Sequence, residues 1–299
     1  MTYGFTRRKV ALSAAGGLLA AAALAGCGDG GGSDGAKKQN TAGSSASEGS
    51  GAGGTPAVQA AYEKTSGART AKMDLDMAVK AGGRSSEVTG TGAVDLKGGE
   101  SDMTLTAEGQ KIRQLTKGTV IYQKLPAGQR GQLPQGKSWM KIDLRKLQEK
   151  QGTSAASGTG MSDPAQSFGY TKGISGKDVK KVGPQTLDGV RTTHYRVSVD
   201  VDKLVKDAPA GQAKQLRQQL GDKLPMDIWL DSEGRLRQET MKLDMKRPKG
   251  ETDGPAKASM TTTLRFSDFG TDVEVKAPSA KDTADMTAEL ARRGGSSKA

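Results

Sequence analysis

The residue with the most specific chemistry in this sequence is a cysteine near its start. Cys27 is the only cysteine among 299 residues, so no disulfide can form within the chain. It follows an apolar run from Val10 to about Ala25, which the basic residues 7–9 precede. A basic stretch, an apolar stretch shorter than the ~20 residues of a membrane span, and then small residues is the order of a secretory signal. The sequence therefore predicts a signal peptide over residues 1–26.

The residues around this cysteine, Leu24-Ala25-Gly26-Cys27, resemble the lipobox of bacterial lipoproteins. The resemblance implies that the chain is cut before Cys27 and that this residue then carries fatty acyl chains such as palmitate. Each buried methylene stabilises membrane attachment by ~0.8 kcal/mol. The expected location is therefore the extracytoplasmic face of the cell membrane. The adjacent Arg7 and Arg8 leave open whether export uses the general or the twin-arginine route.

A flexible tether is expected after the lipidated cysteine. Residues 27–55 contain mainly Gly, Ser, Ala and charged residues, and they include neither an aromatic nor a branched aliphatic side chain. Such a segment cannot bury a core. As a Gly-rich coil it would have an end-to-end distance of roughly 30 Å, which separates the following domain from the bilayer.

Residues that could support catalysis are few. His194 is the only histidine, and a structural or surface role is the favoured interpretation. Ser138-Trp139-Met140-Lys141 matches the S-x-x-K nucleophile motif, but neither S-D-N nor K-T-G accompanies it. Its alternating apolar residues also predict a strand, which would separate the serine from the lysine. The sequence therefore predicts no enzyme, no metal site and no cofactor.

The remaining chain predicts one α+β domain over residues 56–280. Thr55-Pro56 is typical of a helix start, and Gly67 can end that helix. Alternating apolar residues and glycine turns then predict about ten strands of an antiparallel sheet. They fall near residues 72–79, 88–96, 103–107, 112, 120–125, 139–144, 179–183, 193–201, 226–230, 236–245 and 260–269. A second helix is expected over 203–220, and the polar residues 281–299 are expected to form a frayed tail.

Methionine is frequent on the apolar sides of the predicted strands. Its flexible, polarizable side chain suits surfaces that adapt to varied apolar ligands, although plain core packing explains the same pattern. Alternation and helical periodicity place a set of apolar side chains inside, and these are the candidates for a ligand cavity: Tyr62, Met73, Leu75, Met77, Met103, Leu105, Leu216, Leu220, Met241 and Leu243.

The formal net charge of +12 comes from basic residues that are interspersed with acidic ones, without a long basic run. Nucleic acid is not an expected partner of an exported protein. Attraction to anionic lipid headgroups and a merely solvated surface are both compatible with this charge.

Several stretches in the second half resemble LppX/LprG-type lipoproteins. The matching segments are Asp188-Gly189-Val190 with Thr193-His194-Tyr195-Arg196, Leu224-Pro225-Met226-Asp227-Ile228-Trp229-Leu230-Asp231, and Phe266-Ser267-Asp268-Phe269-Gly270. The resemblance covers about residues 56 to 278. It implies a curved antiparallel sheet, a half-barrel like that of LolA lipoprotein carriers, with two or three helices across its concave face. It also implies an apolar cavity between the sheet and the helices near Tyr62 and Leu216.

The sequence thus leaves three hypotheses, and a different structural observation would support each of them. The leading hypothesis is a membrane-anchored carrier of lipid or another apolar ligand. The second is a module that binds or regulates an envelope protein without lipid cargo, which an exposed apolar surface patch would favour. The third is an enzyme, which would need ionisable groups that converge in a cleft.

Overall fold

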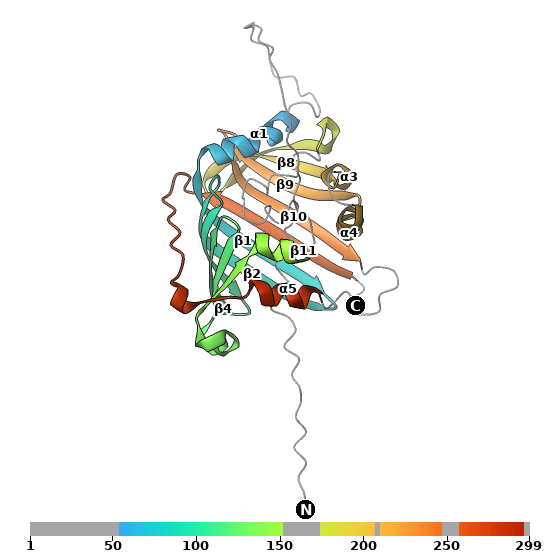
Figure 1. Ribbon diagram of the computed structural model, residues 1–299. Coiled ribbons are helices and arrows are strands. Elements are labelled where there is room, and N and C mark those ends of the chain that lie inside the picture. Colours follow the sequence, from blue (N-terminus) through green and yellow to red (C-terminus); the bar gives the residue numbers. More distant parts are fainter. Residues whose placement is uncertain (1–53, 152–173, 207–209, 247–256, 296–299) are drawn as a thin grey trace, which may run out of the picture.

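The computed structural model is organised around one large sheet (Figure 1). It describes residues 54–151, 174–206, 210–246 and 257–295. Within them, twelve strands form the sheet, in the order β12-β6-β5-β4-β3-β2-β1-β11-β10-β9-β8-β7. The strands are β1 (Thr70–Ala81), β2 (Arg84–Asp95), β3 (Glu100–Ala107), β4 (Gln110–Lys117), β5 (Val120–Lys124), β6 (Trp139–Asp143), β7 (Val179–Leu187), β8 (Val190–Asp200), β9 (Lys223–Asp231), β10 (Leu236–Lys246), β11 (Lys257–Ser267) and β12 (Thr283–Asp285).

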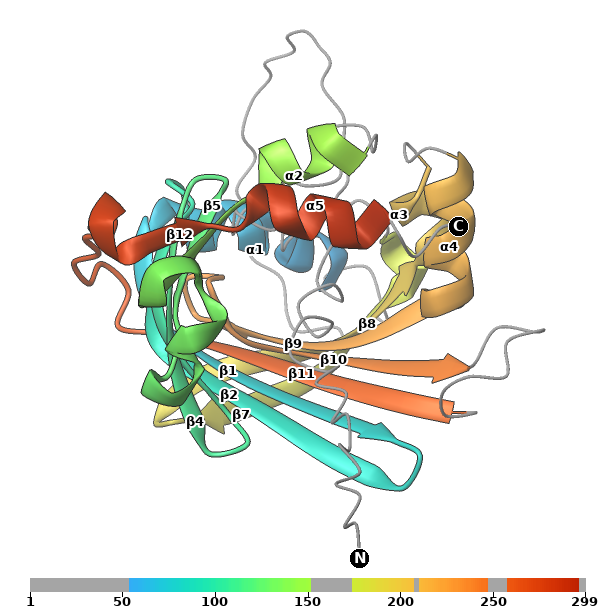
Figure 2. The same cartoon turned by 60° about the horizontal axis from the view of Figure 1, so that its bottom comes forward.

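All neighbouring strands run antiparallel except β12 and β6, which are parallel. The predicted antiparallel sheet is therefore confirmed. The α-helices are α1 (Gly54–Gly67), α2 (Leu144–Gln151), α3 (Val201–Leu204), α4 (Ala210–Leu220) and α5 (Thr287–Gly295). Figure 2 shows that the sheet bends and that α1, α2, α4 and α5 lie on the side towards which it bends. None of the helices in the described residues is long and apolar enough to cross a membrane.

The two faces of the sheet differ in polarity. On β8 and β9, Tyr195, Val197 and Val199 pair with Ile228, Met226 and Leu224, and all six side chains are buried. They belong to one core cluster with two α1 residues, Val58 and Ala61. The face of the sheet that bears these side chains is called the inner face below, and the opposite face the outer face.

One threonine of α1 fixes the helix to the sheet. The buried Thr65 hydroxyl donates a hydrogen bond to the carbonyl of Ala61 at 2.6 Å. The same oxygen accepts a hydrogen bond from the backbone N–H of Leu236, at the start of β10, at 2.8 Å. The Thr65 hydroxyl thus provides a hydrogen-bond acceptor for a buried backbone N–H group that would otherwise lack one. This hydrogen bond fixes the position of α1 on the sheet.

Two glycines on the inner face of β2 allow the neighbouring strand to pack closely. Gly92 pairs with Met73 of β1 and with Met103 of β3. A Cβ atom on Gly92 would lie 2.0 Å from the carbonyl oxygen of Asp102 and 2.8 Å from the Met103 Cα, which no side-chain rotation could relieve. At Gly90 the nearest atom would be a Leu105 side-chain carbon at 2.7 Å.

We therefore predict that Gly92→Ala lowers the free energy of unfolding by about 1–3 kcal/mol or more, because overpacking against backbone forces the strands apart. Urea denaturation monitored by circular dichroism measures this change. The control is Gly128→Ala, where an added Cβ meets no atom within 4 Å. Equal stability of the two variants would contradict the close packing of β2 and β3.

The C-terminal residues differ from the prediction. Residues 281–299 were expected to fray, but β12 pairs with β6, and α5 packs against α2. The sequence of this polar segment contains no local pattern that predicts a strand and a helix. Its structure depends on contacts with residues about 144 positions earlier in the chain. The predicted domain of 56–280 accordingly extends to residue 295 in the structure.

Candidate functional site

The candidate site is the inner face at the centre of the sheet. β1 has five strands on one side, β11 to β7, and six on the other, β2 to β12. Met73, Leu75, Met77 and Val79 of β1 point to the inner face, yet all four remain half-buried. These side chains are therefore less completely buried than the inner-face residues of β8 and β9, although Met73, Met77 and Val79 pack against the core cluster.

The half-buried region continues onto the neighbouring strands. Leu264 of β11 and Gly90 of β2 flank Leu75 in register, and Leu105 of β3 lies beyond Gly90. On the other side, Met241 of β10 pairs with Thr262 of β11. The seven half-buried apolar residues are here called the open strip: Met73, Leu75, Met77, Val79, Leu105, Met241 and Leu264.

The placement of the helices explains why the strip is open. Among the described elements, α1 mainly contacts β7, β9 and β10, and α4 contacts β10. Helices α2 and α5 contact β6 near the other edge. The central strands β1, β2, β3 and β11 therefore lie between two groups of helices. In Figure 1, α1 and α4 lie above α5.

The predicted cavity residues have several environments. Met73, Leu75, Met77, Leu105 and Met241 belong to the open strip, and Met73, Met77 and Met241 also pack against the core cluster. Two further predicted residues, Met103 and Leu243, lie on the inner face but are buried. Tyr62 and Leu220 are partly buried at the edge of the core cluster. Leu216 lies on α4, and its side chain is not among those described. That these residues line a ligand cavity stays a prediction.

An acidic residue on the inner face was missed from the sequence. Glu239 of β10 pairs with Ile228 and Leu264, and only 8% of its surface is exposed. A β-bulge between Leu236 and Gln238 shifts the alternation of β10. Strict alternation from Leu236 would place Glu239 outside, whereas alternation with Met241 and Leu243 places it inside. Glu239 lies two and four positions before Met241 and Leu243, and this spacing predicts that all three side chains lie on the same face.

The outer face is polar and internally paired. His194 Nε2 lies 2.8 Å from Asp227 Oδ1, and its ring stacks on Trp229 with 4.4 Å between centroids. The Trp229 indole N–H donates to Gln185 Oε1 at 2.8 Å. These contacts are those of a structural histidine. Among the described residues, no group of three or more His, Cys, Asp or Glu is arranged to hold a metal ion.

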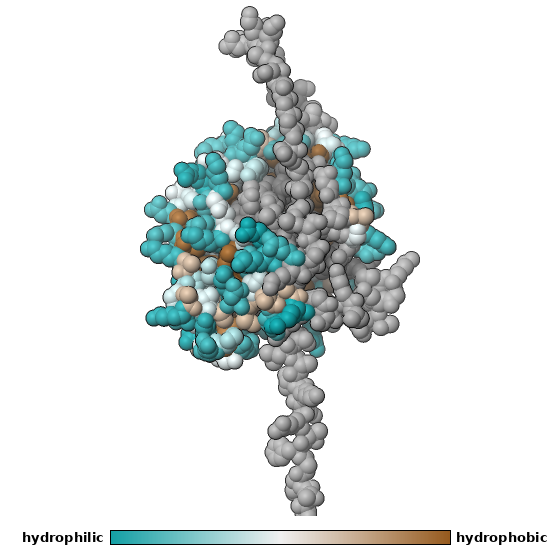
Figure 3. All heavy atoms as spheres, in the orientation of Figure 1, coloured by the Kyte–Doolittle hydropathy of each residue, from teal (hydrophilic) through white to brown (hydrophobic). Residues whose placement is uncertain are grey.

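The outer surface also offers little to an apolar ligand. A groove of about 390 Å³ on this face is lined by polar side chains, among them Asp74, Asp76, Thr91, Thr104 and Arg265. Figure 3 shows the opposite side of the molecule, on which the helices lie in front of the strands, and there too hydrophilic residues dominate the coloured part while hydrophobic residues appear as small separate spots. The open strip is therefore the place where the described structure presents apolar side chains together.

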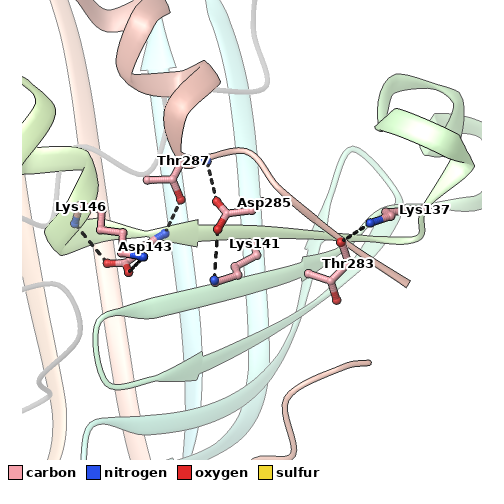
Figure 4. A network of polar contacts seen from close by, with 7 residues as sticks. All are labelled: Lys137, Lys141, Asp143, Lys146, Thr283, Asp285 and Thr287. Atoms are coloured by element: carbon pink, nitrogen blue, oxygen red, sulfur yellow. Dashed lines mark hydrogen bonds and ion pairs between the residues drawn. The ribbon is translucent and has the colours of Figure 1, made fainter. Parts of the chain in front are cut away.

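The C-terminal segment fixes one of the two helix groups beside the strip (Figure 4). The backbone N–H of Asp143 donates to the Thr287 hydroxyl at 2.9 Å, which joins the end of β6 to the start of α5. Lys141 Nζ lies 3.1 Å from Asp285 Oδ2. This hydrogen bond raises the pKa of Lys141 above its ordinary value. Burial acts to raise the pKa of Asp285, but hydrogen bonds from Thr287 and Lys141 outweigh it and lower that pKa.

Comparison with known proteins identifies distant relatives. No family model matches the chain. It is 33% identical over 171 residues to an uncharacterized 31.2 kDa protein of Streptomyces griseus, covering 54% of this chain and 52% of that protein. It is 24% identical over 211 residues to a protein of Streptomyces coelicolor named "Putative lipoprotein", covering 69% of this chain and 63% of that protein. The chain thus spans between about half and two thirds of the curated relatives that it matches.

Solved structures with a similar arrangement include two mycobacterial lipoproteins. LprF of Mycobacterium bovis is 11% identical with a TM-score of 0.40, covering 76% of this chain and 97% of that structure. The lipoprotein LppX of Mycobacterium tuberculosis is 15% identical with a TM-score of 0.39, covering 74% and 99%. A LolA-superfamily protein of Nitrosomonas europaea is 11% identical with a TM-score of 0.26, covering 74% and 94%. As the sequence motifs predicted, the chain resembles LppX-type and LolA-type proteins, and the functional proposal below depends on this chain's own residues.

Proposed function

We propose that this protein is a membrane-anchored lipoprotein that binds and carries lipid or another apolar ligand on the open strip. The single observation that carries the proposal is the incomplete burial of the apolar residues on β1, the central strand. In a half-barrel of the LolA type, with helices across the concave face, a ligand would occupy the space above this strand.

The physical argument concerns the apolar area that the described helices leave uncovered. Contact with water costs about 25 cal/mol for each Å² of apolar surface. An acyl chain laid along Met73, Leu75 and Met77 would remove much of this area from water. Two of these three residues are methionines, whose flexible side chains can adapt to chains of different length and shape.

The membrane anchor belongs to the same proposal. Cys27 lies outside the described residues, so its lipidation rests on the lipobox resemblance. A signal peptide over 1–26 and a tether over 27–55 would place the domain on the extracytoplasmic face of the cell membrane. Such a domain would be positioned to take a lipid from one envelope component and deliver it to another.

The alternative functions have less support from the geometry. A module that binds an envelope protein without cargo would be favoured by an exposed apolar patch. Among the described residues, however, Val182 on the edge strand β7 is the one exposed large hydrophobic residue, with 50% of its surface accessible. For catalysis, His194 would be the expected base, but it is stacked on Trp229 and bonded to Asp227. The proposal therefore assigns no enzymatic activity.

We predict that Met77→Glu reduces lipid retention at least tenfold, because a carboxylate in contact with an acyl chain must lose its hydration. The chain from residue 28 onward, which keeps every described element, is expressed in a lipid-rich host and analysed by native mass spectrometry with lipid extraction. Because Met77 is half-buried, the new carboxylate can reach water and the fold should persist.

The matched control for this experiment is Ala78→Glu. Ala78 is the next residue of the same strand and points to the outer face. The substitution therefore introduces the same charge without contact with the open strip. A lipid-free wild-type protein, or equal lipid loss in both variants, would contradict the proposed site.

We predict that Cys27→Ser moves the full chain from the membrane fraction to the soluble extracytoplasmic fraction, because the variant lacks the thiol that receives the acyl chains. Cell fractionation followed by immunoblotting measures the distribution. Ser33→Ala, a change in the expected tether, is the control and should leave the distribution unchanged. Full membrane retention of Cys27→Ser would show that another feature anchors the protein.

A further inference from the structure

The end of the sheet where β1 turns into β2 carries a cluster of basic side chains. Lys80 lies near the end of β1 and Arg84 at the start of β2, and both are exposed. Lys257, which begins β11, is also exposed, and the next residue, Ala258, pairs with Ala81. Figure 2 shows the β1–β2 turn beside the start of β11 at the lower right. These three basic residues are here called the basic rim.

The basic rim borders a hollow in the surface. The hollow has a volume of about 320 Å³, and the turn between β1 and β2 lines it together with the three cations. The turn residues Gly82 and Gly83 have φ angles of 57° and 79°, which are typical of a tight type I′ hairpin turn. Neither glycine has a side chain, so the turn leaves the space between Lys80 and Arg84 open.

The positive charge of the rim is not compensated within the described structure. None of the three side chains forms an ion pair with another described residue. Two exposed carboxylates lie further along the strands, Glu87 on β2 and Asp244 on β10, and the exposed Lys242 lies two positions from Asp244. The described residues that line the hollow therefore include three cations and no carboxylate.

The positions of the cations favour contact through the end of the sheet. By alternation, Lys80 lies on the outer face together with Ala78, whereas Arg84 pairs with Ala81 and lies on the inner side. The positive charges therefore surround the end of the hairpin instead of covering one face. Val79, the last residue of the open strip along β1, directly precedes Lys80. A surface that contacts the basic rim would thus meet the end of the open strip.

We infer that the basic rim docks the domain on a membrane surface that contains anionic phospholipids. Headgroup phosphates would occupy the hollow and accept hydrogen bonds from Lys80, Arg84 and Lys257. Each Lys or Arg near an anionic membrane surface strengthens binding by about fivefold. This orientation would let an acyl chain pass between the bilayer and the open strip, a role that rests on the proposed lipid-carrying function.

The test measures binding to vesicles by cosedimentation. It uses the chain from residue 28 onward, which keeps every described element and lacks the cysteine of the expected anchor. Neutral vesicles contain phosphatidylcholine alone, and anionic vesicles contain equal parts of phosphatidylcholine and phosphatidylglycerol. The rim variant combines Lys80→Gln, Arg84→Gln and Lys257→Gln, and because all three side chains are exposed, the fold should persist.

The matched control variant combines Lys64→Gln, Arg69→Gln and Lys97→Gln. It removes the same number of Lys and Arg charges, again from exposed side chains. Arg69 directly precedes β1 and Lys97 follows β2, so both lie at the opposite end of this strand pair. Charges farther than about 10 Å from a membrane surface are largely screened at ordinary salt concentrations, so the control should bind like the wild type.

The wild-type chain is expected to bind anionic vesicles about a hundredfold more tightly than neutral ones, from three charges at about fivefold each. The rim variant should lose most of this preference, whereas the control should stay within about twofold of the wild type. Equal losses in the two variants would indicate diffuse attraction and overturn the inference. A wild-type chain without preference for anionic vesicles would overturn it as well.

Inorganic phosphate distinguishes a membrane surface from a free anion. At an ionic strength matched with sodium chloride, phosphate should not displace the wild-type chain, because many headgroups act together at a vesicle. Displacement by phosphate alone would show that the hollow takes a soluble anion and would overturn membrane docking.

A fluorescence measurement decides if the rim variant fails to fold. The chain from residue 28 onward contains no cysteine, so Ser85→Cys and Lys97→Cys each provide one thiol for an environment-sensitive fluorophore. Anionic vesicles should increase the emission of the label at position 85, beside the hollow, and not that at position 97. Equal changes at both positions contradict docking through the rim.

Lipid retention, measured on the same preparations, separates this inference from the carrier function. A wild-type chain that retains lipid but has no preference for anionic vesicles overturns the docking alone. A chain that docks through the rim but retains no lipid contradicts the carrier function and leaves the membrane contact standing.

Discussion

The structure depends on one constraint: a single bent sheet has one apolar face, and that face must be covered. Helices α1 and α4 contact strands between β10 and β7, and α2 and α5 contact β6 near the other edge. The central strand β1 lies between these groups, and its inner side chains stay half-buried. This division leaves the apolar side chains of β1 incompletely buried, and the proposed function rests on that observation.

Local features maintain this division. The Thr65 hydroxyl accepts a hydrogen bond from the backbone N–H of Leu236. This contact holds α1 against β9 and β10. Gly92 lets β2 and β3 pack closely where a methyl group would collide with backbone. At the other side, the bond between Asp143 and Thr287 attaches α5 to the end of β6. Each contact fixes an element beside the open strip, and none of them covers the strip itself.

The sequence predicted the features that depend on local periodicity. Alternation identified the strands and the inner side of β1, including Met73 and Met77, because one-sided burial imposes a period of two. It did not predict the ordered C-terminus, which pairs with β6 through long-range contacts. It also missed Glu239, because the bulge after Leu236 reverses the alternation of β10 and places Glu239 on the same side of the strand as Met241 and Leu243.

The most direct test of the open strip is the rate at which its methionines are oxidised. Hydrogen peroxide reacts with accessible methionine sulfur. Met73 and Met77 are half-buried, whereas Met226 and Met260 on the same face are each 4% exposed. Peptide mass spectrometry should find Met73 and Met77 oxidised first in lipid-free protein and protected after lipid loading. Oxidation of all four at the same slow rate, with or without lipid, would show that the face above β1 is closed and would contradict the account.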